Sequence, residues 1–413
     1  MNKVIASTGL LVIGATSLQA QEASFDNSSD AKPWSIGAVV RGFYDDNSLN
    51  TNSNEIESFG IEFGPSLAYD TSWNGGASRA EASYDYRYRW YEAEARNEDD
   101  QYHIFNIDFD HDVSENIKVS VDERLVITNE PTILDQNVVT AIRLRQDALR
   151  NTFSSRIDWD FADTLSAGVS YANRYYNYEQ ALFSNLLDRT EHLIGVDGRK
   201  ALGNQKTDVV LGYQYGMVDY NGDTIVRQGL APISSSTRDN DSHYIFTGAD
   251  HQFNPNLYGS LRAGAQFVDY SNAVGGDTST TSPYVDANLT YNFTDAQTIL
   301  GVRHARNATD VSGFLAAPVL DQETTTVYGA LQYNFTSSIV GTVNGQAQFS
   351  EFNGGSFQNA NENLYILGAT LGYQLNANLL VEAGYTYTDL ISDDIGGRDF
   401  SRNFIFLGVT ATY

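Results

Sequence analysis

The chain of 413 residues contains no cysteine. This absence excludes a disulfide framework, a thiolate metal site, a cysteine nucleophile and a lipidated N-terminal cysteine. Beyond residue 20 the sequence also lacks any run of about eighteen apolar residues, the length that a transmembrane helix requires. A protein anchored by transmembrane helices is therefore excluded.

Basic residues are scarce, with 25 Lys and Arg against 52 Asp and Glu and a formal net charge of −27. Nucleic acid is therefore disfavoured as a partner, because phosphate binding needs a basic surface. The excess acids are typical of a solvated, acidic surface.

Histidine is rare and offers no catalytic arrangement. The six histidines are His103, His111, His192, His243, His251 and His304. Asp250 and His251 are adjacent, but on a strand they point to opposite faces, which prevents the contact between base and orienting group that acid–base catalysis needs. We therefore predict that the chain is not an enzyme.

Acidic loop segments raise the question of a metal. DDNSLN, DYNGD and DDIGGRD offer oxygen ligands for a divalent cation. None of them matches the twelve-residue calcium-binding loop, and solvated turns account for them more simply. We predict neither a bound metal nor a cofactor.

Residues 1–20 have the features of a secretory signal peptide. Lys3 gives the positive start, VIASTGLLVIGATSL is the apolar stretch, and Ala20 is a small residue at the expected cleavage point. We expect this segment to be removed, residues 21–32 to form a short periplasmic N-terminal segment, and residues 33–413 to form one folded unit.

What the sequence does contain is an alternation of apolar and polar residues. In RAEASYDYRYRWY, residues 79–91, alanine, tyrosine and tryptophan alternate with arginine, glutamate, serine and aspartate. A period of two predicts a β-strand with one apolar face. The segments run to about twelve residues, which is longer than an ordinary strand and long enough to cross a membrane at a tilt.

About eighteen segments share this pattern. They are residues 34–45, 57–70, 77–91, 102–113, 117–128, 149–161, 165–178, 190–200, 207–219, 243–253, 257–270, 283–293, 298–306, 324–335, 339–350, 363–375, 379–389 and 402–413. Tight turns such as NPN, TSS and NAN alternate with longer polar loops. This pattern predicts an all-β fold, a transmembrane, antiparallel, up-and-down β-barrel of about 18 strands in the outer membrane of a Gram-negative cell, with both termini in the periplasm. Closure in lipid also removes the exposed edges of an open sheet.

A recurring phrase marks one end of this barrel. YNFT occurs at Tyr291 and again at Tyr333, and related phrases begin at Gln252 and Tyr373. Their aromatic residues predict a girdle at the boundary with the outer-membrane lipid. The chain ends in FIFLGVTATY, and this end resembles the C-terminal signal of bacterial outer-membrane proteins, which makes the barrel assembly machinery a predicted partner through Tyr413.

Three stretches carry a family resemblance: GFYDDNSLNTNSNEIESFGIEFGPSLAYD at residues 42–70, LRNTFSSRIDWDF at residues 149–161 and GADHQFNPNL at residues 248–257. They resemble the family called putative beta-barrel porin type 2 over most of the mature chain. The resemblance implies an outer-membrane barrel, in some cases associated with surface-polysaccharide loci, and supplies no catalytic residues. Pro65 removes a ladder donor inside a closed sheet, so we expect a local bulge there.

Strand parity assigns a set of side chains to the interior. Arginines concentrate in the first half of the chain, whereas amides, hydroxyls and aromatic rings dominate the second half. The predicted pore-lining residues are Arg41, Glu62, Arg79, Asp85, Arg87, Arg89, Asp108, Asp122, Arg124, Arg150, Arg156, Arg174, Tyr244, Tyr284 and Tyr328. A charged wall facing a neutral, aromatic wall suits sugars and other hydroxylated solutes, although paired charges that merely keep a barrel interior polar give the same pattern.

These features together predict a porin-like passive diffusion channel for small hydrophilic solutes, saccharides among them. The alternative is a non-conducting structural or export-associated barrel linked to surface polysaccharide. The third outer loop, residues 129–147, either constricts the pore, as the third loop of general porins does, or projects into solvent. If it folds inward, Arg143 and Arg145 could reach Asp108 or Asp122.

Overall fold

The computed structural model describes residues 32–93, 99–129, 147–203, 206–221, 234–272, 279–311, 318–392, 395 and 397–413. Within these ranges eighteen strands form a single antiparallel sheet, and the sheet closes into a barrel because β1 pairs with β18. The strands are β1 (Trp34–Asp45), β2 (Ser58–Trp73), β3 (Ser78–Tyr91), β4 (Asp100–Ser114), β5 (Ile117–Thr128), β6 (Ala148–Ala162), β7 (Leu165–Tyr178), β8 (Arg189–Ala201), β9 (Thr207–Tyr220), β10 (Asn240–Asn254), β11 (Leu257–Tyr270), β12 (Ser279–Asn292), β13 (Ala296–Asn307), β14 (Asp321–Thr336), β15 (Ile339–Asn353), β16 (Asn361–Asn376), β17 (Leu379–Ile391) and β18 (Phe400–Thr412). Each predicted strand is present, and the predicted barrel is confirmed.

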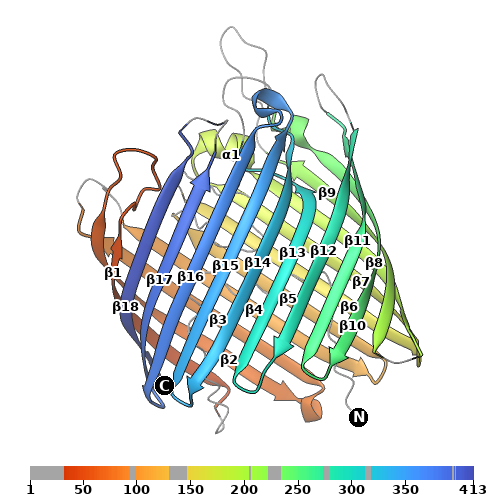
Figure 1. The fold of residues 1–413 in the computed structure, drawn as a ribbon, viewed down its shortest axis with the longest axis horizontal. Coiled ribbons are helices and arrows are strands. Elements are labelled where there is room, and N and C mark those ends of the chain that lie inside the picture. Colours follow the sequence, from red (N-terminus) through yellow and green to blue (C-terminus); the bar gives the residue numbers. More distant parts are fainter. Residues whose placement is uncertain are drawn as a thin grey trace.

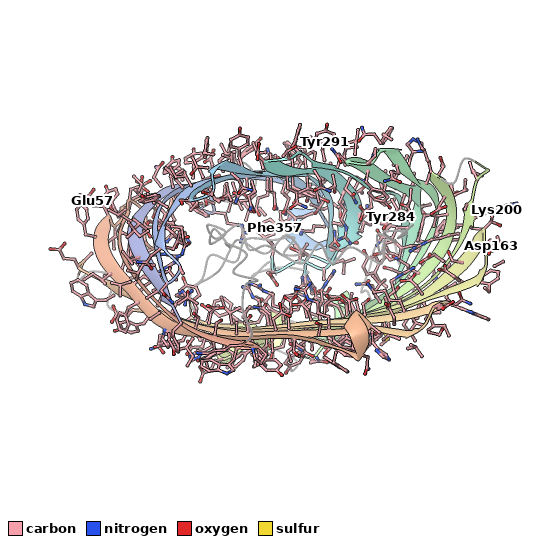
Figure 2. All side chains as sticks on the ribbon, turned by 90° about the horizontal axis from the view of Figure 1, so that it is seen from below. Glu57, Asp163, Lys200, Tyr284, Tyr291 and Phe357 are labelled. Atoms are coloured by element: carbon pink, nitrogen blue, oxygen red, sulfur yellow. The ribbon has the colours of Figure 1, made fainter. Side chains whose placement is uncertain are left out.

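The strands are tilted, and the barrel is oval in cross-section (Figures 1 and 2). Short turns lie at the end that carries the C-terminus, and the longer connections lie at the opposite end, which we call the loop end (Figure 1). The connections include one short helix, α1 (Ala181–Leu187), and three 3₁₀ turns, η1 (Asn74–Gly76), η3 (Ser235–Arg238) and η4 (Gly355–Phe357). In the described residues, no helix has both the length and the apolar character to cross a membrane.

Neighbouring side chains on each strand point to opposite faces. Leu261 and Leu371 are 48% and 51% exposed on the outer face, whereas the adjoining Ser260 and Thr370 are 9% and 6% exposed on the inner face. In Figure 2, Tyr291 points outward and Tyr284 points into the interior. The outer face is therefore apolar along the strands, and a surface of this kind is stable only in apolar surroundings.

The recurring phrases build the short turns. In the turn after β10, the side-chain oxygen of Asn254 accepts hydrogen bonds of 2.9 Å from the amides of Asn256 and Leu257. Thr336 does the same for the amide of Ile339 at 3.1 Å, and each strand shifts register by one residue beside the turn. A side chain that replaces a backbone acceptor closes a tight turn without a longer loop.

The aromatic residues that precede these turns face outward, as predicted. Phe253, Phe335 and Tyr373 are about half exposed, and the rings of Tyr333 and Phe335 meet edge to face at a centroid distance of 4.8 Å. They form one ring around the barrel at the end with the short turns.

Pro65 causes no bulge, so that prediction is wrong. The pairing of β2 with β1 is continuous through Pro65, and the pairing of β2 with β3 resumes in the same register on either side of it, at Phe63 with Tyr88 and at Ser66 with Asp85. A proline on a strand lacks only one donor, here the one that would face β3. The pairing of β2 with β3 therefore leaves Gly64 and Pro65 unpaired, and β2 has no extra residue of the kind that makes a bulge.

Candidate functional site

A buried carboxylate organises the arginines of the first three strands. Glu62 forms ion pairs with Arg41 at 3.1 Å and with Arg89 at 2.5 Å, and Arg87 lies 4.0 Å from it. Arg41 also reaches Glu382 on β17 at 3.2 Å. The structure thus brings four of the predicted lining residues together, and the shared carboxylates balance much of their charge.

A second network crosses β6, β7 and β8. Arg156 lies 2.7 Å from Asp158 and 2.9 Å from Asp197, and Arg199 binds Asp197 at 2.9 Å. The Arg156 guanidinium passes directly over Gly168, where an added Cβ would lie 1.9 Å from its Nη2 atom. Glycine at this position therefore allows Arg156 to reach across β7.

The remaining predicted charges are more dispersed. Arg87 also binds Asp85 at 3.2 Å, and Arg174 binds Glu191 at 3.4 Å. Arg79 stands apart from the networks, because its side chain is 57% exposed near the short turns and pairs only with acidic neighbours such as Asp70, at 3.3 Å.

Two predicted carboxylates lie side by side further along the wall. Asp108 on β4 is directly opposite Asp122 on β5. Arg124 donates to the side-chain oxygen of Asn106 at 3.2 Å, and Arg150 is buried on β6. In the described residues, no ion pair links Asp108, Asp122 or Arg124 to the two networks above.

Two of the three predicted tyrosines meet. The rings of Tyr244 and Tyr284 are in edge-to-face contact at 5.4 Å, and Phe246 lies 5.6 Å from Tyr284. Tyr328 is not part of this group and lies over Gly301, where an added Cβ would be 2.2 Å from its ring.

The second half of the wall, predicted to be mostly neutral, carries many buried amides and hydroxyls but also a row of charges that the prediction omitted. Arg262, Asp286 and Arg303 form a row across β11, β12 and β13, with Asp286 in register with both arginines. The alternation that assigns the other arginines to the interior also places these three residues there, so the signal was present in the sequence. This side of the barrel therefore combines charged side chains with aromatic rings.

Two cavities lie along this wall, with volumes of about 600 and about 740 Å³ including space open to solvent. Both are lined by Leu193, Tyr244 and Arg303. The larger one also contacts Arg156 and Tyr284. These shared residues separate the two cavities on one continuous inner surface.

The loop end of the β13–β14 hairpin lies inside the wall formed by β11 and β12. Gln266 of β11 accepts a hydrogen bond of 2.8 Å from the Arg306 amide and donates one of 3.1 Å to the Arg306 carbonyl. Ser282 of β12 donates to Glu323 of β14 at 2.9 Å. Gln266 and Ser282 belong to the inner faces of their strands, so the end of the hairpin lies on the side of the interior.

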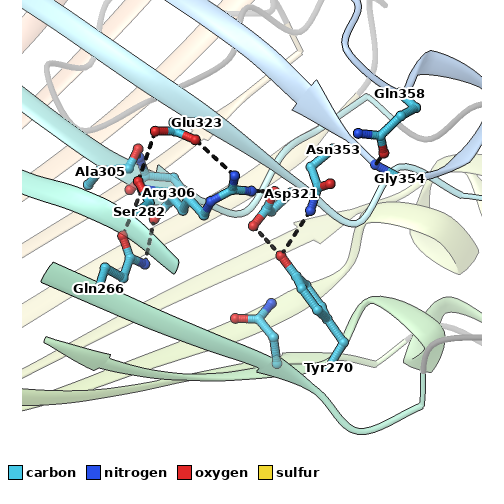
Figure 3. Close-up of polar contacts among 12 residues, drawn as sticks. Gln266, Tyr270, Ser282, Ala305, Arg306, Asp321, Glu323, Asn353, Gly354 and Gln358 are labelled. Carbon is cyan, nitrogen blue, oxygen red and sulfur yellow. Dashed lines mark hydrogen bonds and ion pairs between the residues drawn. The ribbon is translucent and has the colours of Figure 1, made fainter. Parts of the chain in front are cut away.

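Arg306 strengthens the contact between the hairpin and the wall through the carboxylates of β14. It donates to Asp321 at 3.0 Å and to Glu323 at 2.8 Å, while Tyr270 of β11 donates to Asp321 (Figure 3). Asp321 is 2% exposed. A carboxylate this deeply buried requires such partners, so the cluster fixes the hairpin against the wall.

Pro283 explains why β12 and β13 separate. Their pairing stops at Val285 and His304, although β12 continues to pair with β11. The Asn292 amide donates to Asn256 beside β11, and because strand amides alternate in direction, position 283 would donate toward β13. Proline has no amide hydrogen, so the ladder ends there and β13 is released inward.

Two buried arginines hold the segment that follows β13. Arg189 on β8 binds Asp310 at 2.5 Å, and Arg238 of η3 donates to the Thr309 carbonyl. Burial lowers the pKa of Arg238, but an arginine stays charged at neutral pH. We call Arg189, Arg238, Thr309 and Asp310 the latch, because they tie the β13–β14 connection to β8 and η3.

Apolar residues of three long connections pack together with Phe352, near the end of β15, at the loop end. The cluster consists of Val311, Val319, Phe352, Ala360 and Ile395, with Phe357 packed against it. Figure 2 shows Phe357 within the outline of the barrel. This cluster and the latch therefore narrow the interior from the loop end.

The predicted constriction in the third outer loop cannot be compared with this arrangement. Arg143 and Arg145 lie outside the described residues. No sequence pattern indicates a similar role for the β13–β14 connection, because the latch joins residues that are far apart in the chain, such as Arg238 and Thr309 with a separation of 71.

All six histidines bond through Nδ1 to a hydroxyl group on a neighbouring strand. The pairs are His103 with Tyr84, His111 with Ser78, His192 with Tyr171, His243 with Tyr213, His251 with Thr207 and His304 with Thr325. His304 and Ser282 each contact Glu323 at 2.9 Å. The serine thus meets the carboxylate and not the imidazole, which is the wrong order for a nucleophile activated by a base.

No group of three or more metal-ligating side chains occurs among the described residues. In the acidic segment after β1, Asp45 binds Arg402 at 2.5 Å and Asp46 accepts from the Asn403 amide at 2.6 Å. These carboxylates therefore attach the first connection to β18.

A family model described as Putative beta-barrel porin 2 matches residues 37–413. No curated protein sequence matches the chain significantly. Solved structures similar to it include Pseudomonas aeruginosa OccK2 (OpdF) in complex with glucuronate, at 9% identity over 92% of this chain and 98% of that chain, with a TM-score of 0.44. Pseudomonas aeruginosa OpdK has 10% identity over 92% and 99%, with a TM-score of 0.42, and Acinetobacter baumannii OccAB4 has 11% identity over 94% and 100%, with a TM-score of 0.41.

Proposed function

Because the chain belongs to the family described as Putative beta-barrel porin 2, we propose that it is a passive diffusion channel for small hydrophilic solutes, saccharides among them. It is a porin-like β-barrel of the outer membrane, and its family and fold support a channel rather than an enzyme.

One observation carries the proposal. The inner wall is polar, and the two cavities along it, of about 600 and about 740 Å³, are open to solvent. Hollows of this kind, lined by polar groups and a few aromatic rings and open to solvent, suit small hydrophilic molecules. An apolar outer face around a polar interior is the arrangement that lets hydrophilic solutes cross lipid.

Liposome swelling tests this proposal directly. Liposomes that contain the folded full-length chain should swell in isotonic glucose faster than protein-free liposomes, and the rate should fall with solute size from glucose to larger sugars. Swelling no faster than that of protein-free liposomes would contradict passive diffusion.

The latch favours a second candidate, a non-conducting structural or export-associated barrel. Arg189 and Asp310 join the β13–β14 connection to β8, and the apolar cluster of three connections lies over the same end. A barrel closed this way by its own connections would serve as a scaffold. Absence of swelling with all sugars, from a barrel shown to be folded, would favour this candidate.

The predicted partners follow from the outer face. Exposed apolar side chains along the strands support outer-membrane lipid as the surroundings of the barrel. Tyr413 is 72% exposed, and its backbone pairs with Ile36 at 2.8 Å. Recognition of Tyr413 by the barrel assembly machinery is part of the proposal, and removal of this residue should slow assembly.

A further inference from the structure

The larger cavity differs from the rest of the inner wall because several of its polar side chains make no hydrogen bond or ion pair within the described residues. Ser170, Gln214, Ser260, Asp286 and Arg303 all line it. In the described part of the chain, none of these five side chains makes a hydrogen bond or an ion pair with the protein. In the smaller cavity, by contrast, the charged side chains are largely committed to protein partners, as in the pairs of Arg174 with Glu191 and of Arg306 with Asp321.

Asp286 and Arg303 are the informative pair. They lie opposite each other on β12 and β13, yet no ion pair joins them. Arg262, the other register neighbour of Asp286, is instead bound to Asp250 at 2.8 Å. The Nε atom of Arg303 is buried and has no hydrogen-bond partner, and a buried donor without an acceptor is unfavourable.

The floor of the cavity is kept open by a glycine. Gly195 lies between Ser170 and Gln214, and an added Cβ there would be 2.5 Å from the Ser170 hydroxyl oxygen. Phe246 and Tyr284 give the cavity an apolar border. The site therefore combines unused donors and acceptors with an apolar side, which is how pockets orient small ligands.

The charge of the lining selects the ligand class. Arg156 is neutralised by Asp158 and Asp197, so the two charges that remain unpaired in the cavity are one negative, Asp286, and one positive, Arg303. These two opposite charges offset each other, so the cavity has no net charge that would attract an anion or a cation. A neutral molecule with neighbouring hydroxyl groups can donate to Asp286 and accept from Arg303 at the same time.

We propose that Asp286 and Arg303, with Ser170, Gln214 and Ser260, form a binding subsite for a neutral polyhydroxylated solute such as a sugar. The inference rests on the proposed channel function, since it names a subsite on the same inner wall. The subsite has a defined position on the inner wall and is selective for solutes without net charge.

The test uses the full-length barrel in planar bilayers, with maltose as the neutral probe, glucuronate as the anionic probe and glycine as the zwitterionic probe. Maltose should reduce the ion current in a saturable way. Asp286→Asn and Arg303→Gln should each weaken this effect about tenfold, as expected for the loss of one charge-assisted hydrogen bond. Arg124→Gln removes an arginine from another part of the wall and should leave the maltose affinity unchanged.

Three results would overturn the subsite: a conducting wild-type barrel without saturable block by maltose, an equal loss of affinity in Arg124→Gln, or tighter binding of glucuronate or glycine than of maltose. Calorimetry on the detergent-solubilised barrel measures the same binding without a current. Saturable maltose binding by a barrel that does not conduct would contradict the channel and support the subsite. Conduction without maltose binding would support the channel and contradict the subsite.

Discussion

A single substitution on this barrel has an effect that depends on which face it occupies. Leu371 is 51% exposed on the outer face, and its neighbour Thr370 is 6% exposed on the inner face. Leu371→Arg should lower the free energy of unfolding by about 2–4 kcal/mol if it lies near the middle of the bilayer, because a charge there contacts lipid. Thr370→Arg should cost much less, since it reaches the polar interior.

Urea unfolding of both variants in lipid vesicles measures this difference. Equal losses for Leu371→Arg and Thr370→Arg would mean that the assignment of the two faces is wrong. Leu261 and Ser260 offer a second pair with the same relation, at 48% and 9% exposure.

At this scale the sequence predicts the face of a residue well and its partner poorly. The alternation of side chains along β6 correctly predicts that Arg156 faces the interior, because this alternation is a local property of a strand. Its carboxylate partner on β8 is reached only because Gly168 leaves space on β7, and this depends on the register of three strands. The same limit explains why the Glu62 cluster could not be specified from single strands.

The β13–β14 connection is the element with the largest expected influence on conduction. Asp310→Asn combined with Arg189→Gln removes the ion pair of the latch. We expect a severalfold higher single-channel conductance from a barrel that still folds, because the connection is then free to leave the interior. Arg79→Gln, a charge loss at an exposed site near the short turns, is the matched control.

No change in conductance for the latch variant, with unchanged strand content by circular dichroism, would show that the connection does not limit the pore. A smaller conductance would mean that the latch holds the pore open. Either result would contradict this account of the element.

The third outer loop remains a separate prediction. Deletion of residues 138–145 should raise conductance severalfold if this loop constricts the pore. Replacement of Arg143 and Arg145 by Glu should then shift ion preference toward cations, because charges at a narrow point act over a short range. Conductance and reversal potential unaffected by both changes would assign the constriction elsewhere, with the latch as the first candidate.

The ends of the strands could be predicted to within four residues, but their departures from ideal pairing could not. The bounds of β5 and β11 agree with the alternation pattern. The inward position of the β13–β14 hairpin depends on Pro283, and a proline in a strand has different outcomes at different sites. At Pro65 the hydrogen-bond ladder between β2 and β3 is interrupted and then resumes. At Pro283 the ladder between β12 and β13 ends, β13 turns inward, and Arg306 of β13 binds Gln266 of β11 instead.

For the molecule as a whole, the orientation in the membrane is open to direct measurement. The native chain has no cysteine, so one introduced thiol is the sole site of labelling. Ser53→Cys lies in an exposed part of the first long connection and should react with a membrane-impermeant maleimide on intact cells. Ser337→Cys, in an exposed short turn, should react only after the outer membrane is opened. Reversed labelling would contradict the predicted topology.

The architecture was predictable because a closed sheet in lipid leaves few alternatives once strand length, parity and strand number are known. The interior was less predictable, since its shape depends on connections that fold back across several strands. Arg238 reaching Thr309 is one such contact, and the apolar cluster around Phe352 is another. Function depends on this interior, and these connections set its shape.

The most direct test of the central claim is the single-channel conductance of the purified full-length chain in a planar bilayer. A passive channel should give discrete, reproducible current steps over a range of voltages, and the latch variant should give larger steps than the wild type. A folded wild-type barrel that inserts into the bilayer and passes no measurable current at any of these voltages would contradict the channel.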